Sequence, residues 1–123
     1  MLSAHVGGSR VVIVCGPVAV KFPRGDLGIK CNLAEAGIWD RNRNHPTRSR
    51  GLCPVLWCDP EGSVLVMRAA APLPSGANMK DVLDDDWWDY VPGGDGWPCE
   101  PKPADWGVLD GRIVAVDYGA PGY

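Results

Sequence analysis

Long hydrophobic runs are absent from this chain of 123 residues. No apolar stretch approaches the roughly 18 consecutive residues that a membrane-spanning helix needs. The most hydrophobic stretch, residues 11–20, is interrupted by Gly16-Pro17 and runs directly into Lys21. It therefore predicts two strands joined by a turn rather than a secretion signal. We expect a cytoplasmic protein with no membrane partner.

Paired cysteine motifs are also lacking. The chain has five cysteines, an odd number, and only Cys53 and Cys58 lie close together in the sequence. No second pair of cysteines or histidines completes a zinc site at the usual spacing. His45 has no second candidate ligand near it, which disfavours a metal role for that residue. Buried, reduced thiols are the expected state of the cysteines.

Phenylalanine is nearly missing, since the chain has one phenylalanine and six tryptophans. Tryptophan combines apolar bulk with an N–H donor, which suits half-buried positions and contact surfaces. The length allows one hydrophobic core but not two, so a single domain over residues 1–123 is expected. No internal repeat or low-complexity tract is present.

The charges are unevenly distributed along the chain. Residues 1–50 carry eight basic and three acidic side chains, a net charge of +5, and residues 51–123 carry four and twelve, a net charge of −8. Such a chain is a poor general nucleic-acid binder, so no direct nucleic-acid partner is expected. The acidic half either attracts a protein with a basic surface or is a solvated acidic face.

Carboxylates and tryptophans gather in one short segment. The segment ends a helix that is expected to begin near Met79, with Asn78 as its cap. Carboxylates late in a helix oppose its dipole, so they do not serve helix stability. This acidic segment is therefore the candidate site for a protein partner. Its residues are Asp84, Asp85, Asp86, Trp87, Trp88 and Asp89.

Two apolar runs near the N-terminus, residues 10–15 and 18–22, flank Gly16-Pro17 and predict an antiparallel hairpin. Gly7-Gly8-Ser9, which precedes the hairpin, predicts a turn. Lys21 lies inside the second run. Its side chain either extends to solvent, as strand lysines commonly do, or faces a cleft and binds phosphate.

One helix is expected after this hairpin, from about Ile29 to Arg41. Ile29, Leu33 and Ala36 share one face of it and predict an apolar stripe. Glu35 has no obvious basic neighbour on the same helix, so its partner is expected to come from elsewhere in the chain.

The middle of the chain predicts a basic segment and a second pair of strands. Residues 42–51 are polar and lack periodicity, which is typical of a loop or of a positive contact patch. Strands are expected at residues 52–58 and 63–68, joined by a strong turn at residues 59–62. The proline-rich residues 69–76 predict a linker. The expected fold is α+β: an antiparallel sheet of four to five strands with one packed helix, then a short helix and a C-terminal hairpin.

The C-terminal stretch, residues 100–119, predicts a polar loop followed by this hairpin. Asp110-Gly111 lies between two short apolar runs, and both residues accept the positive φ angles of a type I′ turn. Glu100, Asp105 and Asp117 are expected near the two ends of the hairpin. Carboxylates placed in this way either build a metal or phosphate site or remain solvated at the surface.

The order of these elements and residues resembles the protein-kinase-like fold, which includes the aminoglycoside and other small-molecule phosphotransferases. Val18-Ala19-Val20-Lys21 is similar to the strand motif whose lysine holds nucleotide phosphates and pairs with a helix glutamate, here Glu35. Residues 65–69 are similar to the strand that leads into the adenine-binding hinge. The resemblance implies that Met67 and Ala69 contact the nucleotide.

The C-terminal hairpin carries the rest of the resemblance. Residues 100–105 are similar to the catalytic loop, and Asp117-Tyr118-Gly119 is similar to the Asp-Phe-Gly element. The resemblance implies that Asp105 and Asp117 bind magnesium, that Glu100 occupies the position of the catalytic base, and that the cofactors are ATP and Mg²⁺.

The chain also departs from the family. Glu100 stands where the family has an aspartate, and a displacement near 1 Å can lower a rate on the order of a hundredfold. Gly7-Gly8 is a reduced glycine-rich loop. The sequence ends before an activation segment and most of the helical lobe. In this comparison, residues 1–69 correspond to the sheet-and-helix lobe, residues 70–98 to a linker and short helix, and residues 99–123 to the catalytic-loop hairpin.

These departures predict a non-catalytic, kinase-like binding module that acts through protein contacts. One version is an acidic inhibitor that competes with nucleic acid for a basic surface of its target. One alternative is a nucleotide-binding minimal phosphotransferase or pseudokinase that uses Lys21, Glu35, Asp105 and Asp117. Another is a purely structural role, in which Lys21, Glu35 and Asp117 form an internal ion-pair network.

Overall fold

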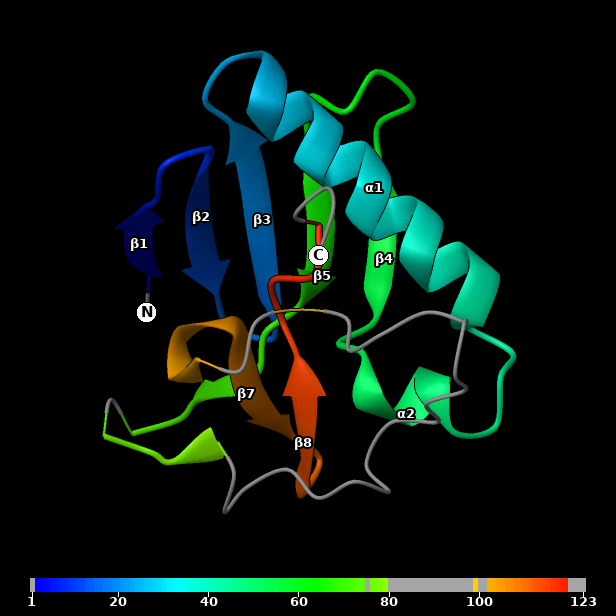
Figure 1. The fold of residues 1–123 in the computed structure, drawn as a ribbon. Coiled ribbons are helices and arrows are strands. Elements are labelled where there is room, and N and C mark those ends of the chain that lie inside the picture. The colour runs from blue at the N-terminus through cyan, green and yellow to red at the C-terminus, as the bar shows by residue number, and fades with distance from the viewer. Residues whose placement is uncertain (1, 75, 80–98, 100–101, 120–123) are drawn as a thin grey trace.

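The computed structural model describes residues 2–74, 76–79, 99 and 102–119, which form two antiparallel sheets and one long helix (Figure 1). The larger sheet has the strand order β1-β2-β3-β5-β4 and the smaller one β6-β7-β8. The larger sheet contains β1 (Leu2–Val6), β2 (Arg10–Cys15), β3 (Val18–Pro23), β4 (Val55–Cys58) and β5 (Leu65–Arg68). The smaller sheet contains β6 (Ala71–Pro72), β7 (Trp106–Leu109) and β8 (Arg112–Ala115). The helical elements are α1 (Asp26–Asn42), α2 (Arg48–Gly51) and the short 3₁₀ turn η1 (Pro103–Asp105). The expected α+β fold is confirmed.

The β2–β3 hairpin forms as expected, with Ile13 opposite Val20 and with Gly16 at a φ angle of 58° in the turn. β1 is a further strand that the sequence did not reveal. All five of its side chains are exposed, so it lacks the alternation of buried and exposed positions that marks a strand. Backbone pairing with β2 holds it in the sheet. The turn expected at Gly7-Gly8-Ser9 joins the two strands, and the amide of Gly7 donates to the carbonyl of Arg10.

α1 crosses one face of the larger sheet (Figure 1) and begins three residues before the predicted start. The predicted apolar stripe was wrong at Leu33, which is 43% exposed, whereas Ile29 is partly buried and Ala36 packs against the core. The buried face instead carries Gly28, Cys31, Asn32 and Glu35. Two of these side chains are polar, and they are buried because their partners lie on other elements, as described below.

The strand predicted at residues 52–58 is shorter than expected. β4 begins only at Val55, because the residues before it join the smaller sheet. Leu52 forms a bridge with Ala115, and the amide of Cys53 donates to the carbonyl of Ala115 at 2.9 Å. The turn before β5 is confirmed: the amide of Gly62 donates to the carbonyl of Asp59, and Gly62 has a φ angle of 77°.

Two segments without predicted structure contain short elements. The basic residues 42–51 include α2, and before it the Nδ1 atom of His45 accepts hydrogen bonds from the amides of Thr47 and Arg48. The proline-rich residues 69–76 include β6, which pairs with β7. Neither element has the length or periodicity that would identify it in the sequence.

The C-terminal hairpin is confirmed. β7 pairs with β8, and Asp110 and Gly111 have φ angles of 51° and 80°, as a type I′ turn requires. The helix expected to begin near Met79 falls mostly on residues 80–98, outside the described part of the chain.

The hydrophobic core lies where α1, the larger sheet and the C-terminal hairpin meet (Figure 1). Its largest apolar members are Trp106, Tyr118, Leu52, Leu65 and Met67. Among the residues with described structure, no helix is long and apolar enough to cross a membrane.

All five cysteines are free thiols, as expected, but the expectation that they are buried holds for only part of the set. Cys31, Cys53 and Cys99 are buried, while Cys58 is partly buried and Cys15 is exposed. Burial raises the pKa of Cys53 to about 11, so this thiol stays protonated at neutral pH.

Candidate functional site

Lys21 points into the protein from the middle of the larger sheet. β3 alternates its side chains, so Ala19 and Lys21 are buried on the same face. The Nζ atom of Lys21 lies 2.5 Å from Oε1 of Glu35 and 2.5 Å from the carbonyl oxygen of Val116. Lys21 therefore does not extend into solvent but lines the cleft described below, and its binding of phosphate stays a prediction.

Glu35 is the acceptor at the centre of this cluster and is fully buried on α1. Besides Lys21, its carboxylate accepts two hydrogen bonds from the guanidinium of Arg10, each at 3.1 Å. It also accepts the backbone amide of Tyr118 at 3.0 Å. Glu35 thus connects α1 to three other elements: β2, β3 and the segment after β8. Its partners are long-range, as the sequence predicted.

Arg10 is the functional candidate that sequence reasoning missed. It begins β2, is almost fully buried, and donates from Nη1 to Oδ1 of Asn32 at 3.1 Å and from Nη2 to Oδ1 of Asp117 at 2.6 Å. Burial disfavours its charged form, but the attraction of Glu35 and then of Asp117 outweighs this, and the pKa of Arg10 is raised. The feature of the sequence that could have identified Arg10 is its position directly before a continuous apolar run, residues 11–15.

Asn32 supports the cluster from α1. Its Nδ2 atom donates to the carbonyl of Lys21 at 3.2 Å and to the carbonyl of Gly62 at 2.9 Å. Asn32 therefore holds together the helix, β3 and the turn before β5. A buried amide is stable in such a position only when its donors and acceptor are paired, as they are here.

Asp105 and Asp117 come together at the end of the C-terminal hairpin. The carbonyl oxygen of Asp105 accepts the amides of Val116 at 2.8 Å and Asp117 at 3.3 Å. The Asp105 side chain is buried, with Oδ2 at 3.8 Å from Nζ of Lys102, whereas that of Asp117 is 51% exposed. Asp105 directly precedes β7 and Asp117 follows β8, so both lie where the hairpin begins and ends, as expected, and the backbone pairing brings these two positions side by side.

Tyr118 and Gly119 fix the position of Asp117 against the helix. The Tyr118 hydroxyl donates to the carbonyl of Cys53 at 2.7 Å, and burial raises the pKa of this phenol well above its usual value. A Cβ atom on Gly119 would lie only 2.4 Å from the carbonyl oxygen of Cys31. The close approach of this segment to α1 therefore requires glycine.

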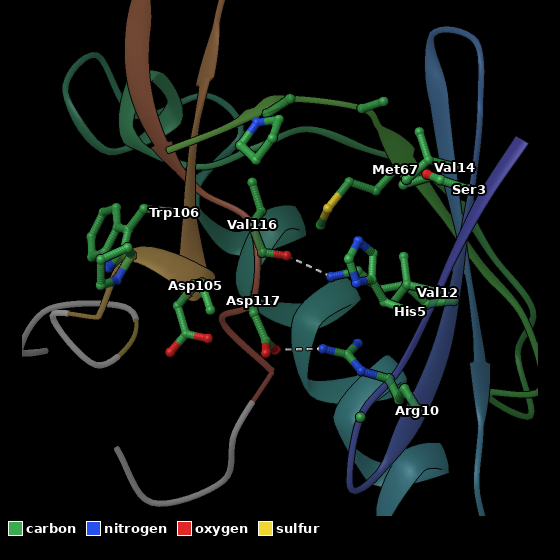
Figure 2. A pocket seen from close by; sticks show the side chains of 18 of the residues that line it. Ser3, His5, Arg10, Val12, Val14, Met67, Asp105, Trp106, Val116 and Asp117 are labelled. Carbon is green, nitrogen blue, oxygen red and sulfur yellow. Dashed lines mark hydrogen bonds and ion pairs between the residues drawn. The ribbon is translucent and has the colours of Figure 1, made fainter. Parts of the chain in front are cut away.

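A cleft of about 910 Å³ separates the larger sheet from the hairpin (Figure 2). On one side lie Arg10, Val12 and Val14 from β2; on the other lie Asp105 and Asp117 (Figure 2). The cleft is also lined by the turn at Gly7-Gly8-Ser9, by Lys21 and by residues 67–70. The ion pair between Arg10 and Asp117 spans the cleft (Figure 2).

Six of the candidate residues from the sequence line or support this cleft. Five of them line it: Lys21, Met67, Ala69, Asp105 and Asp117. The sixth, Glu35, supports the cleft by accepting a hydrogen bond from Lys21. The candidate base Glu100 lies outside the described residues, as does the acidic segment: Asp84, Asp85, Asp86, Trp87, Trp88 and Asp89.

The two aspartates fit a magnesium site poorly. Arg10 already contacts Asp117, and Lys102 lies beside Asp105. Mg²⁺ requires near-octahedral oxygen ligands at about 2.0–2.1 Å, and neighbouring cations oppose its entry. Within the described part of the chain, no group of three or more His, Cys, Asp or Glu side chains could hold a metal ion.

No protein-family model, curated protein or solved structure matches this chain.

Proposed function

We propose that this protein is a kinase-like module that binds a nucleoside triphosphate such as ATP in the cleft between its two sheets. The observation that carries the proposal is the buried Lys21–Glu35 ion pair at 2.5 Å on the wall of that cleft. A lysine oriented by a carboxylate is a typical phosphate-binding group. The order of Lys21, Glu35 and Asp117 in the chain supports the same assignment, because it follows the resemblance.

The size and lining of the cleft also support a nucleotide. Its volume of about 910 Å³ lies within the range of roughly 300–1,000 Å³ that is typical of small-molecule sites. Met67, Ala69 and Ala70 form an apolar wall suited to a base. The glycine-rich turn at residues 7–9 lies at the same cleft and has no bulky side chain to keep phosphates away.

Replacing Lys21 with alanine tests the proposal. We expect ATP binding to weaken by at least about tenfold, because a hydrogen bond to a charged group contributes about 1.5–3 kcal/mol. Titration calorimetry in magnesium-containing buffer measures the change in Kd. Lys30→Ala is the matched control, since Lys30 is an exposed lysine on α1, and its Kd should stay within about twofold of the wild type.

A second variant tests the cleft independently, in case Lys21→Ala does not fold. Ala69→Trp fills the cleft but leaves every charge in place, and it should also prevent ATP binding. Thermal melting establishes that each variant is folded. An absence of heat when the wild-type protein is titrated with millimolar ATP would refute the nucleotide proposal.

A second proposal follows from the charge distribution: the acidic half binds a protein with a basic surface and competes there with nucleic acid. The net charge of −8 over residues 51–123, against +5 over residues 1–50, favours it. The candidate contact is the acidic segment. This proposal is compatible with nucleotide binding, because the described residues that line the cleft are different residues from those of the acidic segment.

We expect neutralisation of the acidic segment to abolish capture of such a partner. The variant carries Asn at positions 84, 85, 86 and 89, and pull-down from the source cell, with and without excess duplex DNA, is the measurement. Capture should be lost in the variant, and the DNA should displace it in the wild type, because both depend on charge. Asp40→Asn with Glu61→Gln, two exposed acidic positions, is the control. Unchanged capture by the acidic-segment variant would contradict the proposal.

A further inference from the structure

Arg10 places a permanent positive charge where the two sheets face each other. Its guanidinium contacts Glu35 on one side and Asp117 on the other, and the side chain lines the cleft (Figure 2). Arginine keeps its charge at all accessible pH values. The cation therefore belongs to the protein itself and does not depend on the buffer.

Among the described residues, the charges at the cleft balance without any added ion. The positive groups Arg10, Lys21 and Lys102 lie beside the negative groups Glu35, Asp105 and Asp117. Arg68, which also lines the cleft, pairs with Asp110. A site built for a divalent cation normally has an excess of carboxylates directed at the metal. Here the carboxylate of Asp117, one of the two positions expected to bind magnesium, accepts from Nη2 of Arg10 at 2.6 Å.

A phosphate that enters the cleft meets Arg10 and Lys21, two of the cations that line it. Lys21 has three N–H donors, and two of them bind Glu35 and the carbonyl of Val116. The Nη2 atom of Arg10 donates to Asp117 on the cleft side. A phosphate oxygen is a stronger acceptor than a carbonyl and competes directly with Asp117 for the guanidinium.

We propose that Arg10 takes the place of a divalent metal, so that the guanidinium and Lys21 together hold the phosphates and nucleotide binding requires no metal ion. This inference rests on the proposed nucleotide site, and it states how that site handles the phosphate charge. In the protein without nucleotide, Asp117 is the counter-ion of Arg10, and phosphate displaces it when the nucleotide binds.

The first test compares ATP binding by the wild-type protein in magnesium-containing buffer and in EDTA. We expect the two Kd values to agree within about fivefold, or binding in EDTA to be tighter. Binding at least about fivefold weaker in EDTA would overturn the inference while leaving the nucleotide site in place. An absence of binding in both buffers would refute the nucleotide site and the inference with it.

The second test is Asp117→Asn, which keeps the shape of the side chain and removes its charge. If Asp117 is a counter-ion, ATP should bind equally well or more tightly in both buffers, because Arg10 is released toward the phosphates. If Asp117 is a metal ligand, binding in magnesium should fall by about tenfold or more, which would overturn the inference. Asp40→Asn on the exposed face of α1 controls for the general loss of a negative charge.

Discussion

Replacing Glu35 with alanine is expected to lower the free energy of unfolding by about 3–5 kcal/mol, because it leaves buried charges without their partner. Glu35 is fully buried and accepts from Arg10, from Lys21 and from the amide of Tyr118. Without it, Asp117, Asn32 and the Val116 carbonyl would be the acceptors left to Arg10 and Lys21 among the described residues. Urea unfolding of the variant and the wild type measures the difference.

Two further variants define the origin of the loss. Glu61→Ala removes an exposed glutamate from the turn before β5 and should change the stability by less than about 0.5 kcal/mol. Glu35→Gln keeps the volume and removes the charge, so it should recover little of the stability lost in Glu35→Ala. A loss below about 1 kcal/mol in Glu35→Ala would show that the cluster does not hold the two sheets and α1 together.

Replacing Trp106 with alanine is expected to destabilise the protein by about 3–5 kcal/mol, the usual loss when a large aromatic side chain leaves a packed core. Trp106 is 1% exposed and begins β7, between the cleft and the core. It directly follows Asp105, so its removal should also loosen the carboxylate end of the hairpin. Urea unfolding measures the stability, and ATP titration of the folded variant measures the effect on the cleft.

Trp57→Ala is the matched control for this prediction. Trp57 lies on β4 and is 54% exposed, so its truncation removes the same atoms with much less buried area. We expect a loss at least about 2 kcal/mol smaller than for Trp106→Ala. Equal losses for the two tryptophans would contradict the burial of Trp106 in the core.

The hairpins were predictable from the sequence because their information is local. An Asp-Gly pair between two apolar runs was enough to identify the β7–β8 hairpin, and Gly16 between two β-branched runs identified the β2–β3 hairpin. Lys21, Glu35 and Asp117 were identified through a resemblance in their order along the chain. The structure brings them together, and their binding of nucleotide stays a prediction.

The polar face of α1 was not predictable in the same way. Periodicity selected Leu33, which is exposed, and passed over Asn32 and Glu35, which are buried. An apolar stripe is the usual buried face of a helix, because unpaired polar groups are costly to bury. The rule fails here because the hydrogen-bond partners of Asn32 and Glu35 come from β2, β3 and the segment after β8.

The sequence by itself determined the local elements of this protein: the turns, the two hairpins, the presence of one long helix and the uneven distribution of charge. Only the tertiary structure decided which charged groups are buried and what they contact. Arg10 and Asp117 are separated by 107 positions in the chain and meet because the C-terminal hairpin packs against the larger sheet. A buried charge is stable only beside its partner, and no local pattern in the sequence records a partner that the fold brings from so far away.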